Sequence, residues 1–301
     1  YLQMMSSGAP PTFLLGLAFV VAGLGFKVAA VPFHMWAPDV YEGAPLPITA
    51  YLAVVSKIAA FALILRLFAT GFLPALEEWQ IILAILAATT MTVGNLVALA
   101  QHNIKRLLAY SSIGHVGYLL MGIAALAAVD SDGRVSTELS HLASNGVMLH
   151  LVAYGITNMA AFLSIAAIFN VTGSEEISSM AGFARRAPWV ALVFAVALFS
   201  LGGLPIFAGF TSKFYLFTAA ADEGLIWLVG LAIINSLISL YYYLMVIKQM
   251  YMVPADDDTP VKVSVVSGGA LGMLIVGIVV IGIYPGPLMN AIEVATRAIL
   301  P

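Results

Sequence analysis

Three lysines lie within long apolar runs, where a primary amine can take up and release a proton as neighbouring charges change. Lys27, Lys57 and Lys213 each have apolar and aromatic residues on both sides in the sequence. An ammonium group at the centre of a membrane costs at least about 2.5–3.5 kcal/mol. Because three such residues would be a large burden without a use, they predict a path for protons or another small cation through the protein.

The alternative for each lysine is a structural one, in which a long stem lets the charged head reach water at the membrane edge. Lys57 lies about ten residues from either end of its apolar run, roughly 15 Å as helix. A lysine stem does not bridge that distance. Lys213 has a similar setting and Lys27 lies nearer an end, and we interpret all three as functional.

Two histidines also stand in the middle of apolar runs. His115 follows Ser111 and Ser112, and a histidine with hydroxyl neighbours inside a membrane can relay a proton. A neutral core histidine bonded to a backbone carbonyl is the alternative, and both interpretations stay open for His115. For His150 we favour the structural interpretation, with proton relay as an accessory role. His34 is a candidate for closing one end of a helix break.

The composition places these residues in a membrane. Of 301 residues, 62% are hydrophobic and 9% are charged, whereas soluble domains carry about 25% charged residues. A helix needs about 20 apolar residues to span the hydrocarbon core, far more than the ~10-residue strands of a membrane barrel. We therefore predict an all-α polytopic protein with eight spans, at roughly 12–33, 46–70, 79–100, 105–128, 139–170, 188–220, 224–250 and 262–284.

Several classes of site are excluded by what the sequence lacks. There is no cysteine, so the chain has neither a disulfide nor a thiolate metal site. A net charge of −3 gives no electrostatic reason to expect nucleic acid as a partner. No phosphate-binding loop, nucleophile elbow or metal-ligand cluster is present. We predict no cofactor in this chain, and the lipid bilayer as its surroundings.

Two spans contain residues that interrupt a helix. A helix over 188–220 would be roughly 50 Å long, too long for a ~30 Å core. Its middle contains Gly202, Gly203 and Pro205, and Pro32 lies at the end of the first span. We predict a break at each place. Non-helical backbone at membrane depth is typical of ion sites in transporters.

The charged loop residues predict the orientation. If the spans alternate, the basic loop residues fall on one side, which the positive-inside rule makes the inner side. The acidic ones fall on the opposite, proton-rich side, together with both ends of the chain. The basic set is Lys105, Arg106, Arg185, Arg186, Lys248 and Lys262, and the acidic set is Glu77, Glu78, Asp130, Asp132, Asp222 and Glu223.

Other polar residues are interpreted as structural. The short basic turn 101–106 is expected to anchor the topology. Asp39 is expected to cap a helix. The tyrosine run 241–243 is expected to form an aromatic belt at the inner face of the membrane.

The segments 25–45, 56–59, 103–113, 201–215 and 241–244 closely resemble subunit N of bacterial NADH-quinone oxidoreductases, which has counterparts in mitochondrial complex I and in the chloroplast enzyme. The likeness extends over essentially the whole chain. The Pro-Asp-Val-Tyr-Glu-Gly form at 38–43 separates it from the sibling subunits L and M, which share the Pro-Asp and Asn-Ile-Lys-Arg elements.

The resemblance implies an antiporter-like fold of fourteen helices with two inverted five-helix repeats. The spans present would be the seventh to the fourteenth, and we expect the first six helices of that fold to be missing here. Residues 1–70 would hold the last two helices of the first repeat. Residues 71–253 would form the second repeat, and 254–301 a C-terminal helix and tail.

The resemblance also implies roles for the buried residues in a proton-translocating membrane-arm subunit of a complex I-type translocase. Lys27 would serve the first half-channel, without the glutamate that the missing helices would supply. Lys57 would link it towards the centre, His115 would bridge the two halves, and Lys213 would serve the second half-channel.

Partners and cofactors follow from the same resemblance. FMN, iron–sulfur clusters and quinone are expected in partner subunits, and the neighbours would be antiporter-like subunit M and small subunits such as K. The bacterial plasma membrane is the favoured location over the mitochondrial inner or thylakoid membrane. Three alternatives stay open: a subunit of a multisubunit Na+/H+ antiporter, a purely structural subunit, or a related complex fed by ferredoxin, F420 or formate.

Overall fold

The computed structural model describes residues 10–72, 76–126, 137–255, 259–261 and 263–299, and the regular elements within them are helices. They are α2 (Pro11–Val28), α3 (Trp36–Gly43), α4 (Leu46–Arg66), the π-helical turn η1 (Leu67–Gly71), α5 (Leu76–Ala98), α6 (Ile104–Ala124), α7 (Thr137–Thr172), the 3-10 turn η3 (Ile177–Met180), α8 (Phe183–Arg186), α9 (Pro188–Gly202), α10 (Ala208–Asp222), α11 (Ile226–Met252), α12 (Val265–Ile283) and α13 (Gly286–Ile299).

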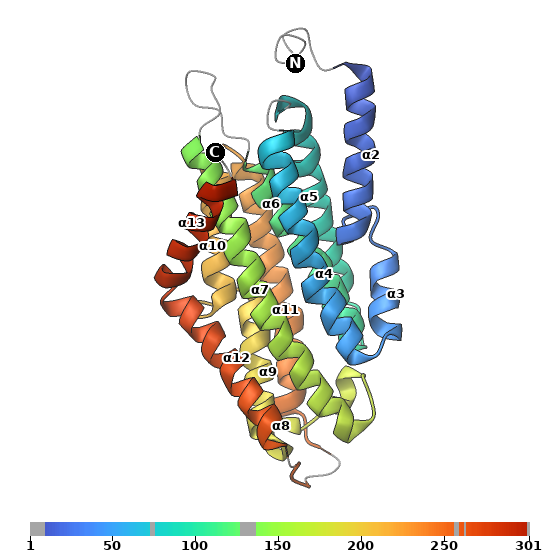
Figure 1. Ribbon diagram of the computed structural model, residues 1–301. Coiled ribbons are helices and arrows are strands. Elements are labelled where there is room, and N and C mark those ends of the chain that lie inside the picture. Colours follow the sequence, from blue (N-terminus) through green and yellow to red (C-terminus); the bar gives the residue numbers. More distant parts are fainter. Residues whose placement is uncertain (1–9, 73–75, 127–136, 256–258, 262, 300–301) are drawn as a thin grey trace.

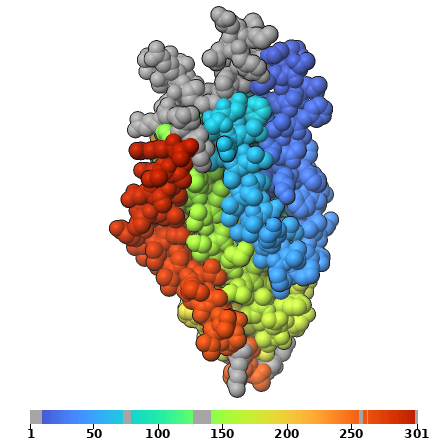
Figure 2. Space-filling model, in the orientation of Figure 1, coloured from blue at the N-terminus to red at the C-terminus, as the bar shows by residue number. Residues whose placement is uncertain are grey.

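The long helices run side by side in alternating directions, so the molecule is an elongated bundle (Figure 1). Seven helices of the described residues are long and apolar enough to cross a membrane, and α9 with α10 makes an eighth crossing. Figure 2 shows α7 exposed in a seam between α4 and α12. The predicted membrane protein class is therefore confirmed.

The described members of the predicted basic set gather at one end of the bundle, where Asp39, Glu42, Glu175 and Glu176 also lie. Helices α6 and α9 begin, and α5, α7 and α11 end, at the lower end of Figure 1, which we call the basic end. It carries Lys105, Arg106, Arg185, Arg186 and Lys248, whereas Asp222 and Glu223 lie at the opposite, acidic end. The predicted contributions of Asp130, Asp132 and Lys262, and of the Glu77 and Glu78 side chains, lie outside the described residues.

Both predicted helix breaks are present. Helix α2 ends at Val28, Ala29 has a left-handed backbone (φ 61°), and α3 begins only at Trp36, beyond Pro32. Helix α9 ends at Gly202, and α10 begins at Ala208, beyond Pro205. Helices α9 and α10, of 15 residues each, together cover one crossing, whereas α2 is long enough to cross by itself and the first break follows it.

The second break begins with a glycine-dependent helix end. Gly203 has φ 84°, a conformation that strains other residues, and its N–H and that of Leu204 both donate to the carbonyl of Phe199. This closes α9 but leaves the carbonyls of its last turn facing the bundle interior. The backbone polar groups freed here are the ones that the candidate site uses.

Helix α6 is the centre of the bundle. Every residue of α6 except Arg106 is buried, so it has no lipid-facing side. It packs most extensively against α5, where glycines allow the two backbones to touch. A Cβ atom on Gly94 would lie 2.6 Å from the Gly114 nitrogen, and one on Gly117 would lie 2.5 Å from the Met91 nitrogen.

Ion pairs hold the start of α6 to α3 and to the segment after α7. Lys105 pairs with Glu175 at 2.7 Å and donates to the carbonyl of Ala44 at 2.9 Å. Arg106 contacts both Asp39 and Glu42 at 2.7 Å. The buried Lys105 thus ties α6 to the segments after α7 and α3, and the more exposed Arg106 ties α6 to α3, so the basic turn is a structural contact as well as an inner-side marker. The interpretation of Asp39 as a helix cap was wrong, because its carboxylate accepts from Arg106 and α3 has no side-chain cap.

The C-terminal segment is helical where the sequence suggested a tail. Helix α13 follows α12 and packs on α7, burying Met289, Ile292 and Thr296. The Thr296 hydroxyl lies 3.4 Å from the sulfur of Met148. The search for apolar spans did not reveal this helix, because an amphipathic helix has only a narrow apolar stripe and not a continuous apolar run.

The α5–α6 contact predicts a sharp sensitivity to side-chain size. Gly94→Leu should destabilise the folded subunit by about 3 kcal/mol, since a fully packed backbone contact must open. The unfolding temperature of the purified protein and the amount of protein inserted in the membrane should both decrease. Gly230→Ala on α11 is the matched control, because its added Cβ meets nothing within 4 Å. Equal stability of the two variants would contradict the packing described here.

Candidate functional site

Helices α4, α6 and α7 meet at Lys57, in the middle of the bundle. Its side chain is only 5% exposed, and Nζ donates to the backbone carbonyl of Ser112 at 3.0 Å and contacts the Ser112 hydroxyl. That hydroxyl lies 2.7 Å from the hydroxyl of Tyr154 on α7. Protein dipoles therefore solvate the amine. Its partner Ser112 lies one turn before His115 on α6.

A histidine pair continues this polar line towards α10. The Nδ1 atom of His115 lies 3.2 Å from Nε2 of His150, and the two rings are stacked with centroids 5.4 Å apart. The other nitrogen of His150, Nδ1, lies 3.0 Å from the Ser212 hydroxyl. His150 therefore has polar side chains at both nitrogens, where the favoured interpretation expected a backbone carbonyl.

Lys213 occupies the second helix break. Its Nζ donates to the carbonyls of Leu201 at 2.9 Å and Gly202 at 3.4 Å, at the C-terminal end of α9. It also lies 3.0 Å from the Ser236 hydroxyl and 4.9 Å above the ring of Tyr118. The end of a helix carries partial negative charge, so the break provides a cation site without a carboxylate.

Two glycines allow the break to fold so tightly. A Cβ atom on Gly203 would lie 3.2 Å from Nζ of Lys213, and one on Gly209 would lie 1.7 Å from the carbonyl oxygen of Ser200. The Ser200 hydroxyl accepts the N–H of Gly209 at 3.1 Å. The start of α10 is thus fixed against the end of α9, which sets the position of Lys213.

The tyrosine run corrects an expectation. Tyr241 is 59% exposed, as an aromatic belt requires, but Tyr242 and Tyr243 are buried. The Tyr243 hydroxyl contacts that of Ser111, and the Tyr242 hydroxyl donates to Oδ1 of Asn95 at 3.0 Å. The belt interpretation was wrong for these two, and the clue in the sequence was the two asparagines, Asn95 and Asn235, in otherwise apolar helices.

Lys27 and His34 lie apart from this line. Helix α2 stands at one edge of the bundle, packed on α4, and Lys27 in its last turn has an exposed side chain (Figure 1). His34 lies in the first break, and its Nδ1 is buried with no hydrogen-bond partner among the described residues. The structure therefore brings together Lys57, His115, His150 and Lys213, but not Lys27 or His34.

The buried line contains no carboxylate. Among the described residues, every aspartate and glutamate is at least partly exposed, and the ion pairs of Lys105 and Arg106 lie away from this line, at the basic end. The described part of the chain also includes no group of three histidine or acidic side chains able to hold a metal. The site's chemistry therefore rests on amines, imidazoles and hydroxyls.

Polar atoms without partners lie on the acidic side of the histidine pair. Ser144 Oγ and Asn145 Oδ1, on α7, are buried with no hydrogen-bond partner among the described residues. At the end of α10, Glu223 Oε1 is likewise buried with no hydrogen-bond partner among the described residues. Burial, and secondarily the charge of Asp222, raise the pKa of Glu223 to about 7.

The family model described as NADH:quinone oxidoreductase/Mrp antiporter, TM, matches residues 2–239. The NADH-quinone oxidoreductase subunit N of Desulforamulus reducens is 43% identical over 298 residues, covering 99% of this chain. This chain spans 60% of the length of that relative.

Two solved structures share the fold. A chain of respiratory complex I from Thermus thermophilus, solved with bound aureothin, is 34% identical with a TM-score of 0.77, covering 95% of this chain and 61% of that one. A chain of the membrane-bound sulfane sulfur reductase, an archaeal respiratory membrane complex, is 26% identical with a TM-score of 0.84, covering 99% and 58%.

The raised pKa of Glu223 predicts a pH-dependent stability. The unfolded chain loses this proton near pH 4.5 and the folded protein near 7, so stability falls as pH rises between these values. Glu223→Gln removes that loss. Its melting temperature should exceed that of the wild type at pH 8, with the difference shrinking towards pH 5. The control is Asp222→Asn, which should give a smaller gain, and a pH-independent difference would contradict the assignment.

Proposed function

We propose that this chain, which belongs to the NADH:quinone oxidoreductase/Mrp antiporter family of transmembrane proteins, is a proton-translocating membrane-arm subunit of a complex I-type NADH:quinone oxidoreductase. It is an integral membrane protein, and its bacterial relatives support the bacterial plasma membrane as its location. The chain would move protons while the redox reaction takes place in other subunits.

The observation that supports this proposal is the line of buried titratable groups contributed by four helices. Lys57 on α4 contacts Ser112 on α6, and Lys213 lies in the α9–α10 break. Between the two lysines, His115 and His150 are within hydrogen-bond distance of each other. Because the line joins side chains of α4, α6, α7 and α10, it suits the transmission of charge between neighbouring half-channels.

The mechanism follows from the low dielectric around these groups. Two like charges repel far more strongly in a protein interior than in water. A proton arriving at Lys57 therefore favours the departure of a proton from Lys213. The histidine pair can rearrange its protons between the two, because an imidazole can donate at one nitrogen and accept at the other.

Lys213 has the contacts needed to alternate between its two protonation states. As an ammonium it donates to the α9 carbonyls and to the Ser236 hydroxyl. As an amine it can accept from that hydroxyl, because a serine both donates and accepts. The buried polar atoms of Ser144 and Asn145 mark the side on which protons would leave, towards the acidic end.

The role proposed for Lys27 rests on the sequence resemblance to subunit N, because Lys27 does not contact the buried line of titratable groups. Its exposed side chain would face protein outside this sequence, as the first half-channel requires. The division into repeats at 71 and 253 is part of the same proposal. FMN, iron–sulfur clusters and quinone would be held by partner subunits, among them neighbours equivalent to subunits M and K.

Two further functions use the same geometry. The family description includes Mrp antiporters, so ion exchange without a redox partner is the main alternative. The likeness to a chain of an archaeal sulfane sulfur reductase supports a second, in which the electron donor differs and this subunit is unchanged. Co-purification of flavin and iron–sulfur subunits with quinone reductase activity would separate the first proposal from ion exchange.

The proposal predicts the behaviour of Lys213. Lys213→Met in the assembled complex should lower proton translocation and the coupled quinone reduction by about tenfold or more, since no other group fills the carbonyl site. The measurement is proton uptake by inverted membrane vesicles supplied with NADH. Lys248→Met is the matched control, because this lysine is exposed at the basic end of α11. Normal pumping by a well-assembled Lys213→Met complex would refute the role of Lys213.

A further inference from the structure

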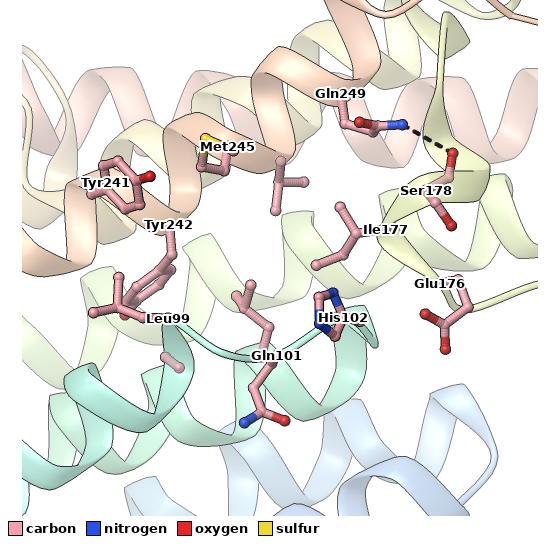
Figure 3. A pocket seen from close by; sticks show the side chains of 13 residues that line it. Leu99, Gln101, His102, Glu176, Ile177, Ser178, Tyr241, Tyr242, Met245 and Gln249 are labelled. Atoms are coloured by element: carbon pink, nitrogen blue, oxygen red, sulfur yellow. Dashed lines mark hydrogen bonds between the residues drawn. The ribbon is translucent and has the colours of Figure 1, made fainter.

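A cavity of about 410 Å³ opens at the basic end of the bundle. It lies between the end of α5, the turn η3 and the last turns of α11, as Figure 3 shows. His102 and Glu176 stand exposed at its edge, and Gln249 donates to the carbonyl of Ser178 across one side.

The cavity reaches from the basic end well into the interior of the bundle. Helix α5 stops at Ala98, whereas α11 continues from Tyr242 to Met252, roughly 15 Å further as helix. Tyr242 is both a lining residue of the cavity and 3% exposed, so it forms the inner wall. Because α5 ends before α11 does, a solvent-facing hollow reaches a buried tyrosine.

A polar branch leads inward from this wall. The Tyr242 hydroxyl donates to Oδ1 of Asn95 at 3.0 Å, and Nδ2 of Asn95 lies 3.4 Å from Oδ1 of Asn235. Asn235 is followed by Ser236, whose hydroxyl accepts from Nζ of Lys213 at 3.0 Å. Three helices contribute polar groups between the cavity and the lysine, and the step from Asn235 to Ser236 rests on their being neighbours in α11.

Burying the two amide side chains of this branch costs free energy, so their presence needs an explanation. Asn95 and Asn235 are each 1% exposed, in helices that are otherwise apolar. An amide in an apolar interior costs free energy unless all its hydrogen bonds are made. The contact of Asn95 with the Tyr118 hydroxyl, at 3.4 Å, leads to the same lysine, because the ring of Tyr118 lies under Nζ of Lys213.

We propose that this cavity is the basic-side entrance through which protons reach Lys213, by way of Tyr242, Asn95 and Asn235. The inference rests on the proposed function and adds the source of the proton. In the net step, an O–H bond of water at the Tyr242 wall breaks, an N–H bond forms on the neutral amine of Lys213, and the hydroxide ion that remains passes from the cavity to the solvent on the basic side. The asparagines are positioning residues, which hold hydroxyl groups and water in line.

Removing one hydroxyl tests the entrance. Tyr242→Phe keeps the ring and deletes the donor to Asn95, so proton translocation per quinone reduced should fall by about tenfold in the assembled complex. Tyr251→Phe is the matched control, since Tyr251 is on the same helix but outside the cavity. The measurement is proton uptake by inverted vesicles, with subunit assembly checked on native gels.

The two proposals fail in different ways. If Tyr242→Phe pumps like the wild type while Lys213→Met in parallel vesicles does not, the entrance is refuted and the proposed function stands. If Lys213→Met pumps normally, the proposed function is refuted and the entrance falls with it.

A second measurement holds even if Tyr242→Phe assembles poorly. The chain has no cysteine, so Met245→Cys places its one thiol at the lining of the cavity. A membrane-impermeant maleimide added from the basic side should label this thiol and lower pumping. The control Val276→Cys, on the exposed side of α12, should stay unlabelled in lipid. An unlabelled Met245→Cys would show that lipid or a partner subunit seals the cavity, which overturns the proposal.

Discussion

A cation buried in hydrocarbon must be solvated by the protein itself, and the arrangement of this bundle depends on how Lys213 meets that requirement. An unbroken helix has no spare carbonyls in its middle, because each one is bonded to an N–H four residues on. Ending α9 at Gly202 frees the carbonyls of Leu201 and Gly202 at membrane depth, where they accept from Nζ. The break must then be covered by protein. Helix α12 covers it so closely that a Cβ on Gly282 would lie 2.0 Å from the carbonyl oxygen of Ile206.

The same requirement explains why α6 has no lipid-facing side. Its polar residues point to different neighbours: Ser111 contacts Tyr243 on α11, Ser112 contacts Lys57 on α4, and His115 contacts His150 on α7. A helix exposed on one face could not serve three partners around its circumference. Glycines on the α5 side let the backbones touch, so the polar contacts are held in a closely packed setting.

The sequence predicted what violates the rules of a membrane helix. Lysines in apolar runs and a Gly-Gly-Leu-Pro segment inside an over-long span stand out from composition and length alone, so the burial of Lys57 and Lys213 and the positions of both breaks could be predicted. The contacts that depend on which face of a helix a residue occupies were not predicted. Tyr242 and Tyr243 look like belt residues because tyrosine is common at interfaces, and only the partner helices reveal their buried hydroxyls. Lys105 and Asp39 were likewise taken as local signals, whereas each is paired with a distant segment.

The rigidity of α6 bears on how the two broken helices communicate. Arg106 at its start holds α3 through Asp39 and Glu42, and Tyr118 farther along lies against Lys213. One helix thus contacts α3, which follows the first break, and the lysine of the second break. Sliding or rotating it would open the backbone contact at Gly94 and separate Ser112 from Lys57. A shift in protonation needs no such movement, because the interior has low dielectric and the lysines have no buried carboxylate among the described residues to neutralise them. Close packing and uncompensated charge together favour electrostatic coupling between the breaks over coupling by helix motion.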